Sequence, residues 1–309
     1  MKKIFIDGSA GTTGLRIRER LAAREDLTLI TLPEELRKDA AARREALNSA
    51  DVSFLCLPDD AAREAVAMIE NPNAAVIDTS TAHRTAAGWT YGFPELGGRR
   101  AEIATAKRIA NPGCHASGFV ALVAPLIAAG LLSPDVPLSA FSLTGYSGGG
   151  KKMIAEYESE GRDAALNAPR QYGLTQKHKH LPEMQAICGL SRAPIFSPIV
   201  ADYYAGMEVT VPLFADAVKG TPADIAALYR ETYREGLVHF DPSMGEGGLL
   251  CGAGFAGRDD MTVGVLGNDE RILLVARFDN LGKGASGAAI QNMNILLGTD
   301  EAAGLVTGE

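Results

Sequence analysis

Short apolar runs alternate with amphipathic stretches through the first third of the chain. Val, Ile, Leu and Phe fill the runs, as they fill strands buried on both faces of a parallel sheet. The runs lie at residues 3–6, 27–31, 51–57, 74–78 and 107–110. Helical spacing predicts helices between them, at 15–21, 34–49 and 61–69. This βαβ order predicts a Rossmann-like α/β domain with a parallel sheet.

The pattern changes after residue 132. Period-two alternation predicts strands that each have one buried face, at 138–144, 207–212, 261–266 and 271–279. These strands no longer alternate with helices, which predicts an α+β domain with a mainly antiparallel sheet. A helix rich in small residues, within 279–297, is expected to pack back onto the first domain. The predicted domains are 1–115 with 283–309 for dinucleotide binding, and 116–282 for substrate binding and dimerisation.

A glycine-rich turn joins the first strand to the first helix. Gly8, Gly11 and Gly14 have a GxxGxxG spacing, and small residues at a helix N-terminus let backbone N–H groups reach a pyrophosphate. A plain tight turn is the alternative. Because ligands of parallel sheets bind at the strand ends, the end of the 51–57 strand is included. The predicted cofactor contacts in this part of the chain are Gly8, Ser9, Gly11, Thr12, Thr13, Gly14, Arg16, Leu57 and Pro58.

The second strand ends at Thr31, without the acidic residue that holds the ribose hydroxyls of NAD. Arg16 and Arg18 lie in the first predicted helix, near the glycine turn, where a cation suits the extra phosphate of NADP. The sequence therefore favours NADP.

Cys114 lies between a short strand and a long apolar segment, 118–132, that we predict to be a buried helix. At a helix N-terminus, free N–H groups and the helix dipole favour the thiolate, which is the nucleophilic form. The alternative is a small buried cysteine in a turn.

Further along, His178 and His180 flank Lys179, before a helix that Pro182 begins. One of these histidines could act as a general acid or base if the fold brings it to Cys114. A solvated basic loop is the alternative.

Composition excludes several classes of protein. The formal net charge is −8, which argues against nucleic acid or an anionic membrane surface as a partner. The longest apolar run is too short to span a bilayer. The four cysteines form no CxxC pair, so we expect no disulfide framework, no metal site and a reducing cytoplasmic setting.

The stretch 145–152, rich in glycine and ending in two lysines, has two interpretations, a flexible linker or an anion-binding loop.

Several motifs together resemble the N-acetyl-gamma-glutamyl-phosphate reductase family, in its shorter bacterial form. They are the glycine turn at 8–14, the YGFPEL run at 91–96, NPGC at 111–114, SGGGK at 147–151, HKHLPE at 178–183 and NLGKGASG at 280–287. The family more often has an aromatic residue after its cysteine, where this chain has His115. It usually has Asp-Phe-Arg where this chain has Ala82-His83-Arg84.

The resemblance implies NADP-dependent reduction of an acyl phosphate to an aldehyde, with release of inorganic phosphate. Cys114 would form a thioester, and His178 or His180 would move protons. The Gly-rich start of the small-residue helix within 279–297 is another place to meet a cofactor phosphate or amide, which adds Lys283 and Gly284 to the cofactor contacts. The predicted substrate contacts are Arg84, Asn111, Ser147, Lys151 and Glu183. A homodimer or homotetramer is expected.

Two alternatives stay open. One is an aspartate-semialdehyde dehydrogenase, whose substrate is one carbon shorter and bears a free amine. The other is a non-catalytic NADP-binding sensor on the same fold.

Overall fold

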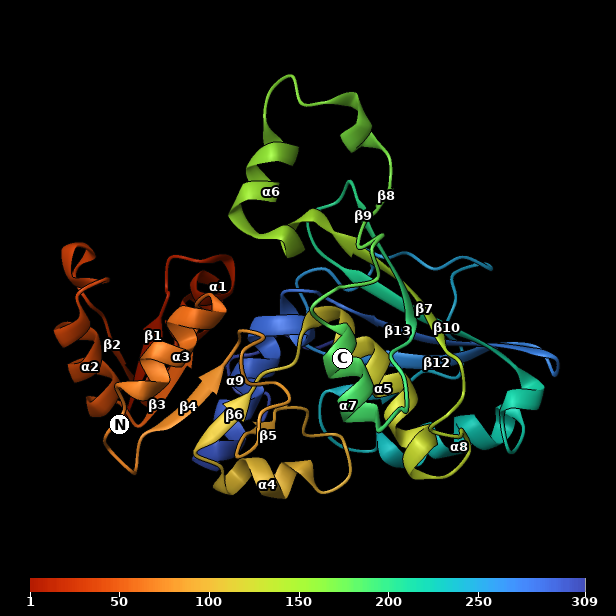
Figure 1. Ribbon diagram of the computed structural model, residues 1–309, viewed down its shortest axis with the longest axis horizontal. Helices are drawn as coiled ribbons and strands as arrows, with labels where there is room; N and C mark the ends of the chain where they lie inside the picture. Colours follow the sequence, from red (N-terminus) through yellow and green to blue (C-terminus); the bar gives the residue numbers. More distant parts are fainter. Residues whose placement is uncertain (309) are drawn as a thin grey trace. The chain divides into compact units, whose positions relative to one another are not determined.

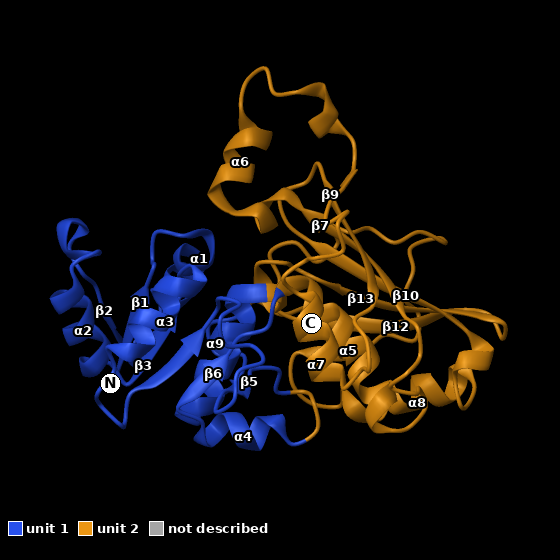
Figure 2. Ribbon diagram, viewed as in Figure 1, with its two compact units in different colours: residues 1–94, 98–113, 285–305 blue, residues 95–97, 114–284, 306–309 orange. Residues whose placement is uncertain are grey.

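The computed structural model describes residues 1–308 and divides them into two compact units (Figure 2). Unit 1 holds residues 1–94, 98–113 and 285–305, and unit 2 holds residues 95–97, 114–284 and 306–308. The chain passes from unit 1 to unit 2 after residue 113 and back after residue 284, each two residues from the predicted boundary. The division also places residues 95–97 and 306–308 with unit 2, whereas both segments were predicted to belong to the first domain.

Unit 1 is built on a six-stranded sheet with the order β2-β1-β3-β4-β6-β5 (Figure 1). Every pairing in it is parallel, so the predicted Rossmann-like sheet is confirmed. The strands are β1 (Lys2–Asp7), β2 (Leu27–Ile30), β3 (Val52–Leu55), β4 (Ala75–Asp78), β5 (Thr90–Tyr91) and β6 (Arg108–Ala110).

Helices cover both faces of this sheet, because alternate strand residues point to opposite sides. Ile4 packs in one cluster with residues of α9, and Phe5 packs in another with Leu47 of α2. The expected return of the C-terminal helix to the first domain is thus confirmed, with Ile290 fully buried. The helices are α1 (Thr12–Leu21), α2 (Ala40–Ser49), α3 (Asp59–Ala67), α4 (Arg99–Thr105) and α9 (Gly287–Leu297).

The single helix predicted over 34–49 is wrong. A short 3-10 turn, η1 (Glu34–Leu36), comes first, and α2 begins only at Ala40. Asp39 explains the break, because its side chain accepts a hydrogen bond from the Ala42 N–H and so caps a new helix.

Unit 2 is built on a seven-stranded sheet with the order β11-β12-β13-β10-β7-β9-β8. Its central pairings β7–β10, β10–β13 and β13–β12 are antiparallel, and β7–β9 and β11–β12 are parallel. The predicted, mainly antiparallel sheet is confirmed. The strands are β7 (Ser139–Gly145), β8 (Arg170–Gln171), β9 (Ile195–Ala201), β10 (Met207–Phe214), β11 (Val238–Phe240), β12 (Met261–Gly267) and β13 (Arg271–Phe278).

Helix α5 (Cys114–Ala128) is the central helix of unit 2 and packs directly on the sheet. At Gly118 a side-chain carbon would lie 2.6 Å from Val209, so only glycine permits this approach. Pro125 has no N–H for the Ala121 carbonyl, and the Tyr233 hydroxyl donates to that carbonyl instead. The other helices of unit 2 are α6 (Gly150–Glu158), α7 (Leu181–Cys188) and α8 (Pro222–Thr232).

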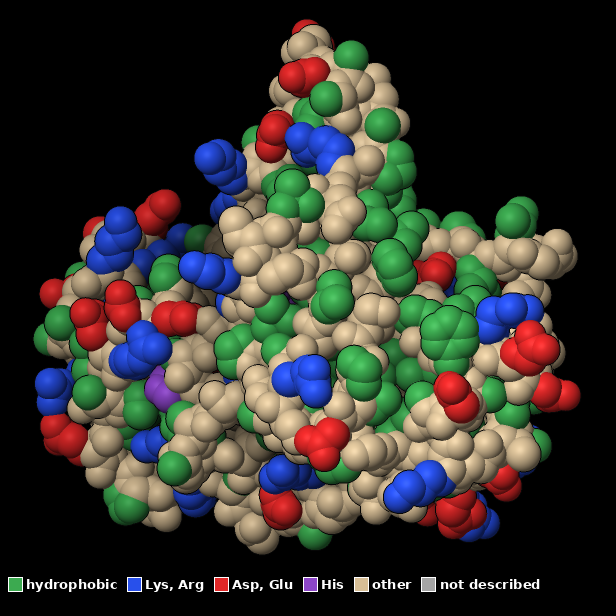
Figure 3. Space-filling view, turned by 45° about the vertical axis from the view of Figure 1, so that its right-hand side comes forward, with side chains coloured by type: hydrophobic (Ala, Val, Ile, Leu, Met, Phe, Trp, Pro, Cys, Tyr) green, Lys and Arg blue, Asp and Glu red, His purple; other side chains and the backbone are tan. Residues whose placement is uncertain are grey.

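The sheet face away from α5 carries exposed apolar side chains. Phe141, Ile195, Phe214 and Leu273 come from neighbouring strands, and the strand register places them on one face. They are between 39% and 69% exposed. Figure 3 shows hydrophobic side chains gathered in the middle of the view. Within residues 1–308, no helix is long and apolar enough to cross a membrane.

Candidate active site

Cys114 is the first residue of α5, and the chain reaches it from β6 through the turn 111–113. The predicted strand-to-helix position is confirmed, and the helix begins four residues before the predicted start at 118. The first turn of a helix presents N–H groups without helical partners, and the helix dipole is positive there. Both effects favour a thiolate at Cys114, whose side chain is only partly buried.

His178 and His180 lie beside the residue that follows Cys114. Their ring centroids are 5.6 Å and 5.5 Å from that of His115, and 4.8 Å from each other. His180 directly precedes α7, and α7 packs against α5. The contact between these two helices therefore brings the histidines to the start of α5. Cys114 and the two imidazoles that could transfer protons near it thus belong to the same unit, unit 2.

His115 and Tyr172 are members of this cluster that sequence reasoning missed. The His115 Nδ1 atom lies 2.6 Å from Ser142 Oγ, and its Nε2 atom lies 2.6 Å from Tyr172 Oη. His115 is 3% exposed. Burial, with smaller effects from His178 and Lys179, lowers the pKa of His115 to about 3. The only sequence signal was a histidine directly after the cysteine.

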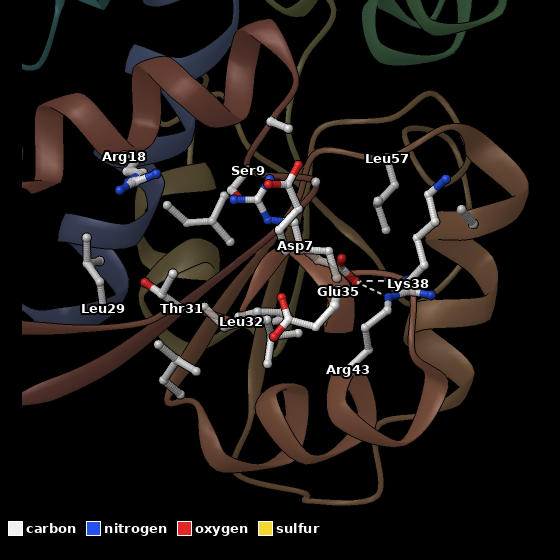
Figure 4. Close-up of a pocket in the computed structure, with 18 residues that line it drawn as sticks. Asp7, Ser9, Arg18, Leu29, Thr31, Leu32, Glu35, Lys38, Arg43 and Leu57 are labelled. Atoms are coloured by element: carbon white, nitrogen blue, oxygen red, sulfur yellow. Dashed lines mark hydrogen bonds and ion pairs between the residues drawn. The ribbon is translucent and has the colours of Figure 1, made fainter.

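A cavity of about 660 Å³ lies in unit 1 at the ends of β1 and β2 (Figure 4). Gly8, Ser9 and Leu57 line it, whereas the other predicted contacts of the glycine turn and Pro58 are not among its lining residues. The predicted Arg16 does not line it either. Arg18, two residues further along α1, does line it. Figure 4 shows Arg18 on one side of the view and Lys38 on the other, and Arg37 and Arg43 also line the cavity.

The three glycines of the turn have separate tasks. Gly8 has a φ of +83°, and a side-chain carbon there would lie 2.2 Å from the Cys56 carbonyl oxygen. At Gly14 such a carbon would lie 2.6 Å from the Gly8 carbonyl oxygen. Gly11 donates its N–H to that oxygen, and as the residue before α1 it supplies no side-chain cap. The first N–H groups of α1 are thus left without a side-chain acceptor, which suits an anionic pyrophosphate.

A buried ion pair shapes the base of the same cavity. Asp7, the last residue of β1, accepts hydrogen bonds from Nε and Nη2 of Arg43 at 3.0 Å and 2.8 Å. Both side chains line the cavity, and Figure 4 marks the pair with dashed lines. The positive charge of Arg43 thus balances the negative charge of the Asp7 carboxylate, which lies beside the place where phosphates would bind.

Two predicted substrate residues of unit 1 are largely buried. Arg84 donates from Nε to the Asn111 carbonyl oxygen and from Nη2 to that of Thr79, both at 3.1 Å. Asn111 donates to the Ala285 carbonyl oxygen and accepts from Asn292. These bonds join the loops that follow β4 and β6 to the start of α9.

The predicted substrate residues of unit 2 differ in exposure. Ser147 is buried and accepts from Asn280 at 2.9 Å, and Glu183 is buried in the first turn of α7. Lys151 is exposed on α6. The linker interpretation of 145–152 is wrong, since the stretch forms a 3-10 turn, η2 (Tyr146–Gly149), and the start of α6.

Lys283, predicted as a cofactor contact, points into the core of unit 2. Its ammonium lies 2.8 Å and 2.9 Å from the two carboxylate oxygens of Glu95, and the two side chains are 1% and 0% exposed. Gly284, the other contact predicted here, packs on Cys114, because a side-chain carbon at 284 would lie 3.0 Å from Cys114 Cβ. These positions favour a structural role for both residues. In residues 1–308, no group of three His, Cys, Asp or Glu side chains could hold a metal ion.

Comparison with known proteins agrees with this fold. Two protein-family models match: "Semialdehyde dehydrogenase, NAD binding domain" over residues 24–106, and "Semialdehyde dehydrogenase, dimerisation domain" over residues 114–280. Solved structures of aspartate semialdehyde dehydrogenases have the same fold. Enzyme II from Vibrio cholerae has a TM-score of 0.73 at 17% identity, covering 96% of this chain and 98% of its own. The enzyme from Francisella tularensis has a TM-score of 0.70 at 14% identity, covering 96% and 100%. The class is therefore that of the semialdehyde dehydrogenases.

Curated relatives narrow the class. The N-acetyl-gamma-glutamyl-phosphate reductase of Mesorhizobium japonicum is 46% identical, over 96% of this chain and 99% of its own length. That of Brucella anthropi is 48% identical, over 96% and 98%. The chain belongs to the N-acetyl-gamma-glutamyl-phosphate reductase family.

Proposed function

We propose that this protein uses NADPH to reduce N-acetyl-gamma-glutamyl phosphate to N-acetylglutamate semialdehyde, a step of arginine biosynthesis that releases inorganic phosphate. The observation that carries the proposal is Cys114 at the start of α5, with two imidazoles beside the next residue. Identity of 46% to 48% to reductases of that name, over almost the whole chain, supports this substrate over aspartyl phosphate.

Cys114 is the nucleophile in this proposal. Its thiolate attacks the acyl carbon, the bond from that carbon to the phosphate oxygen breaks, and phosphate leaves behind a thioester. Bound NADPH supplies the hydride that reduces the thioester carbon. The N–H groups of the first turn of α5 would stabilise the oxyanion on that carbon. When the carbon–sulfur bond breaks, the aldehyde is released and the thiolate is restored.

His178 and His180 are the candidates for proton transfer. The Nδ1 atom of His178 accepts a hydrogen bond from the backbone N–H of His180 at 3.2 Å. The proton of a neutral His178 is therefore on Nε2, which can donate but not accept. This geometry makes a neutral His178 a proton donor, so the role of the base falls to His180 in this proposal.

The cavity of unit 1 is the proposed cofactor site. Gly8 and Gly14 have no side chain, so the turn can pack tightly against the neighbouring backbone. The uncapped start of α1 would hold the pyrophosphate. Arg18, Arg37 and Lys38 would bind the extra phosphate of NADPH. Ser9 and Leu57 would line the nucleotide.

The protein is expected to be an oligomer, as the matched dimerisation domain indicates. We propose a homodimer, alone or within a homotetramer, formed through the exposed apolar face of the unit 2 sheet. A cytoplasmic setting is part of the proposal, because it keeps unpaired cysteines reduced.

The test uses Cys114→Ser together with a control, Cys251→Ser, at an exposed cysteine. We expect Cys114→Ser to abolish NADPH oxidation with N-acetyl-gamma-glutamyl phosphate and to keep NADPH binding, measured by nucleotide fluorescence. Cys251→Ser should keep both. Substantial turnover by Cys114→Ser would refute the covalent mechanism. Faster turnover of aspartyl phosphate would favour the aspartate-semialdehyde alternative. Binding without turnover of either substrate would favour the sensor.

A further inference from the structure

A short chain of hydrogen bonds runs through His115. Ser142 of β7 is on one side of its imidazole ring and Tyr172, after β8, is on the other, each at 2.6 Å. Ser142 is 0% exposed, and His115 Nδ1 is the only hydrogen-bond partner of its hydroxyl among the residues that the structure describes. His115 Nε2 is likewise the only such partner of the Tyr172 hydroxyl.

These partners determine where the single proton of the neutral imidazole lies. A buried hydroxyl hydrogen without an acceptor costs free energy, so Ser142 donates its hydrogen to Nδ1. Because Nδ1 accepts, the imidazole proton is on Nε2, which donates to Tyr172 Oη. The phenolic hydrogen of Tyr172 then has no acceptor within the described residues and is available to a ligand.

The surroundings keep both groups in these states. His178, His180 and Phe196 pack around the His115 ring, and Lys179 lies near enough to disfavour a positive charge on it. Tyr172 lies near Cys114: burial raises the pKa of its hydroxyl, and the negative charge of a Cys114 thiolate raises it further. Tyr172 therefore keeps its proton near the nucleophile. Its ring centroid is also 5.9 Å from that of His178.

We propose that the Tyr172 hydroxyl donates a hydrogen bond to an oxygen of the substrate held at Cys114, and that His115 is a positioning residue which turns that hydroxyl outward by donating to its oxygen. The proposal rests on the proposed function, since it assumes a substrate bound at Cys114. No step in it needs a further reactant, because the proton stays on Tyr172 throughout.

The tautomer of His115 is testable without any turnover. In protein labelled with ¹⁵N-histidine, NMR should show a protonated Nε2 and a bare Nδ1 for His115, unchanged between pH 5 and 9. Ser142→Ala removes the donor to Nδ1, so a shift of proton density toward Nδ1 is expected in that variant. A proton on Nδ1 in the wild-type protein would overturn the positioning role.

Kinetics test the role of Tyr172. Tyr172→Phe should lower kcat roughly 10- to 100-fold, as expected for one lost hydrogen bond to a reacting group, and leave the KM for NADPH unchanged. His115→Phe should lower kcat comparably, and the double variant should lose no more than the worse single one, because both act through the same hydroxyl. The control is Tyr233→Phe, which loses a buried bond to α5 but should keep its kcat.

The outcomes separate this proposal from the proposed function. If the wild-type protein reduces neither acyl phosphate, the proposed function fails and the Tyr172 assignment fails with it. If the wild-type protein is active and Tyr172→Phe keeps its kcat, or loses only thermal stability as Tyr233→Phe does, the Tyr172 assignment alone is refuted. Additive losses in the double variant would refute the action of His115 through Tyr172.

Discussion

The ion pair between Lys283 and Glu95 yields a prediction that separates a structural role from a cofactor role. The Lys283 ammonium makes hydrogen bonds of 2.8 Å and 2.9 Å to both Glu95 oxygens, and neither side chain is more than 1% exposed. Glu95 also accepts from the Leu237 N–H at 2.9 Å, which ties it to the segment before β11. Lys283→Met should therefore destabilise unit 2.

The magnitude follows from the charge that the substitution leaves behind. Breaking a buried ion pair by removing one partner costs about 3–5 kcal/mol, since the other charge stays buried and loses its counter-ion. For a unit of this size, each kcal/mol shifts Tm by about 2–4 °C, so a decrease on the order of 10 °C is expected. The double variant Glu95→Gln with Lys283→Met should recover part of this loss. It carries no unpaired charge, and the amide oxygen can still accept from Leu237.

The assay combines thermal and urea unfolding with steady-state kinetics well below Tm. The structural role predicts a lower Tm for Lys283→Met, partial recovery in the double variant and an unchanged KM for NADPH. An unchanged Tm together with a tenfold higher KM for NADPH would refute this reasoning and assign Lys283 to the cofactor, as the sequence first suggested.

Two further predictions concern the proposed cofactor site. Gly8→Ala should weaken NADPH binding at least tenfold, measured by fluorescence titration, because its side-chain carbon would meet the Cys56 carbonyl oxygen at 2.2 Å. Gly88→Ala is the matched control, since Gly88 has a similar φ of +80° but open space; equal binding losses in both variants would contradict the argument. Arg18→Glu and Lys38→Glu should each raise the KM for NADPH roughly tenfold and leave the KM for NADH nearly unchanged, since repulsion acts on the extra phosphate. An equal rise for both cofactors would place that phosphate elsewhere.

The sequence predicted the parallel sheet and the place of Cys114 between a strand and a helix because each depends on local signals. Strands buried on both faces read as continuous apolar runs, and the turn before Cys114 separates such a strand from a long apolar helix. The cap of α8 is equally local, because Thr221 and Asp224, three residues apart, bond to each other reciprocally. The break of the 34–49 helix was also local, but the capping side chain at Asp39 was overlooked.

The site was less predictable where it depends on contacts between distant segments. Tyr172 is 57 residues from His115, and it meets the imidazole only because β8 pairs with β9, which in turn pairs with β7. No periodicity marks such a meeting. Likewise, the assignment of Arg16 rather than Arg18 to the cofactor turned on which side of α1 faces the cavity, and this depends on how the helix packs on β1 and α9.

The two glycine-rich turns of the chain show what sequence alone does not distinguish. Both Gly8–Gly14 and Gly282–Gly287 precede a helix, and both suggested a phosphate site. At Gly282 a side-chain carbon would lie 1.9 Å from the Arg258 carbonyl oxygen, and at Gly284 it would meet Cys114. In the second turn, glycine is therefore required for packing against the nucleophile, and Lys283 between them is directed to Glu95. The first turn borders an open cavity lined by cations. In both turns the glycine spacing predicts that another group comes close to the backbone. The neighbours of each glycine decide whether that group is a ligand or another part of the protein.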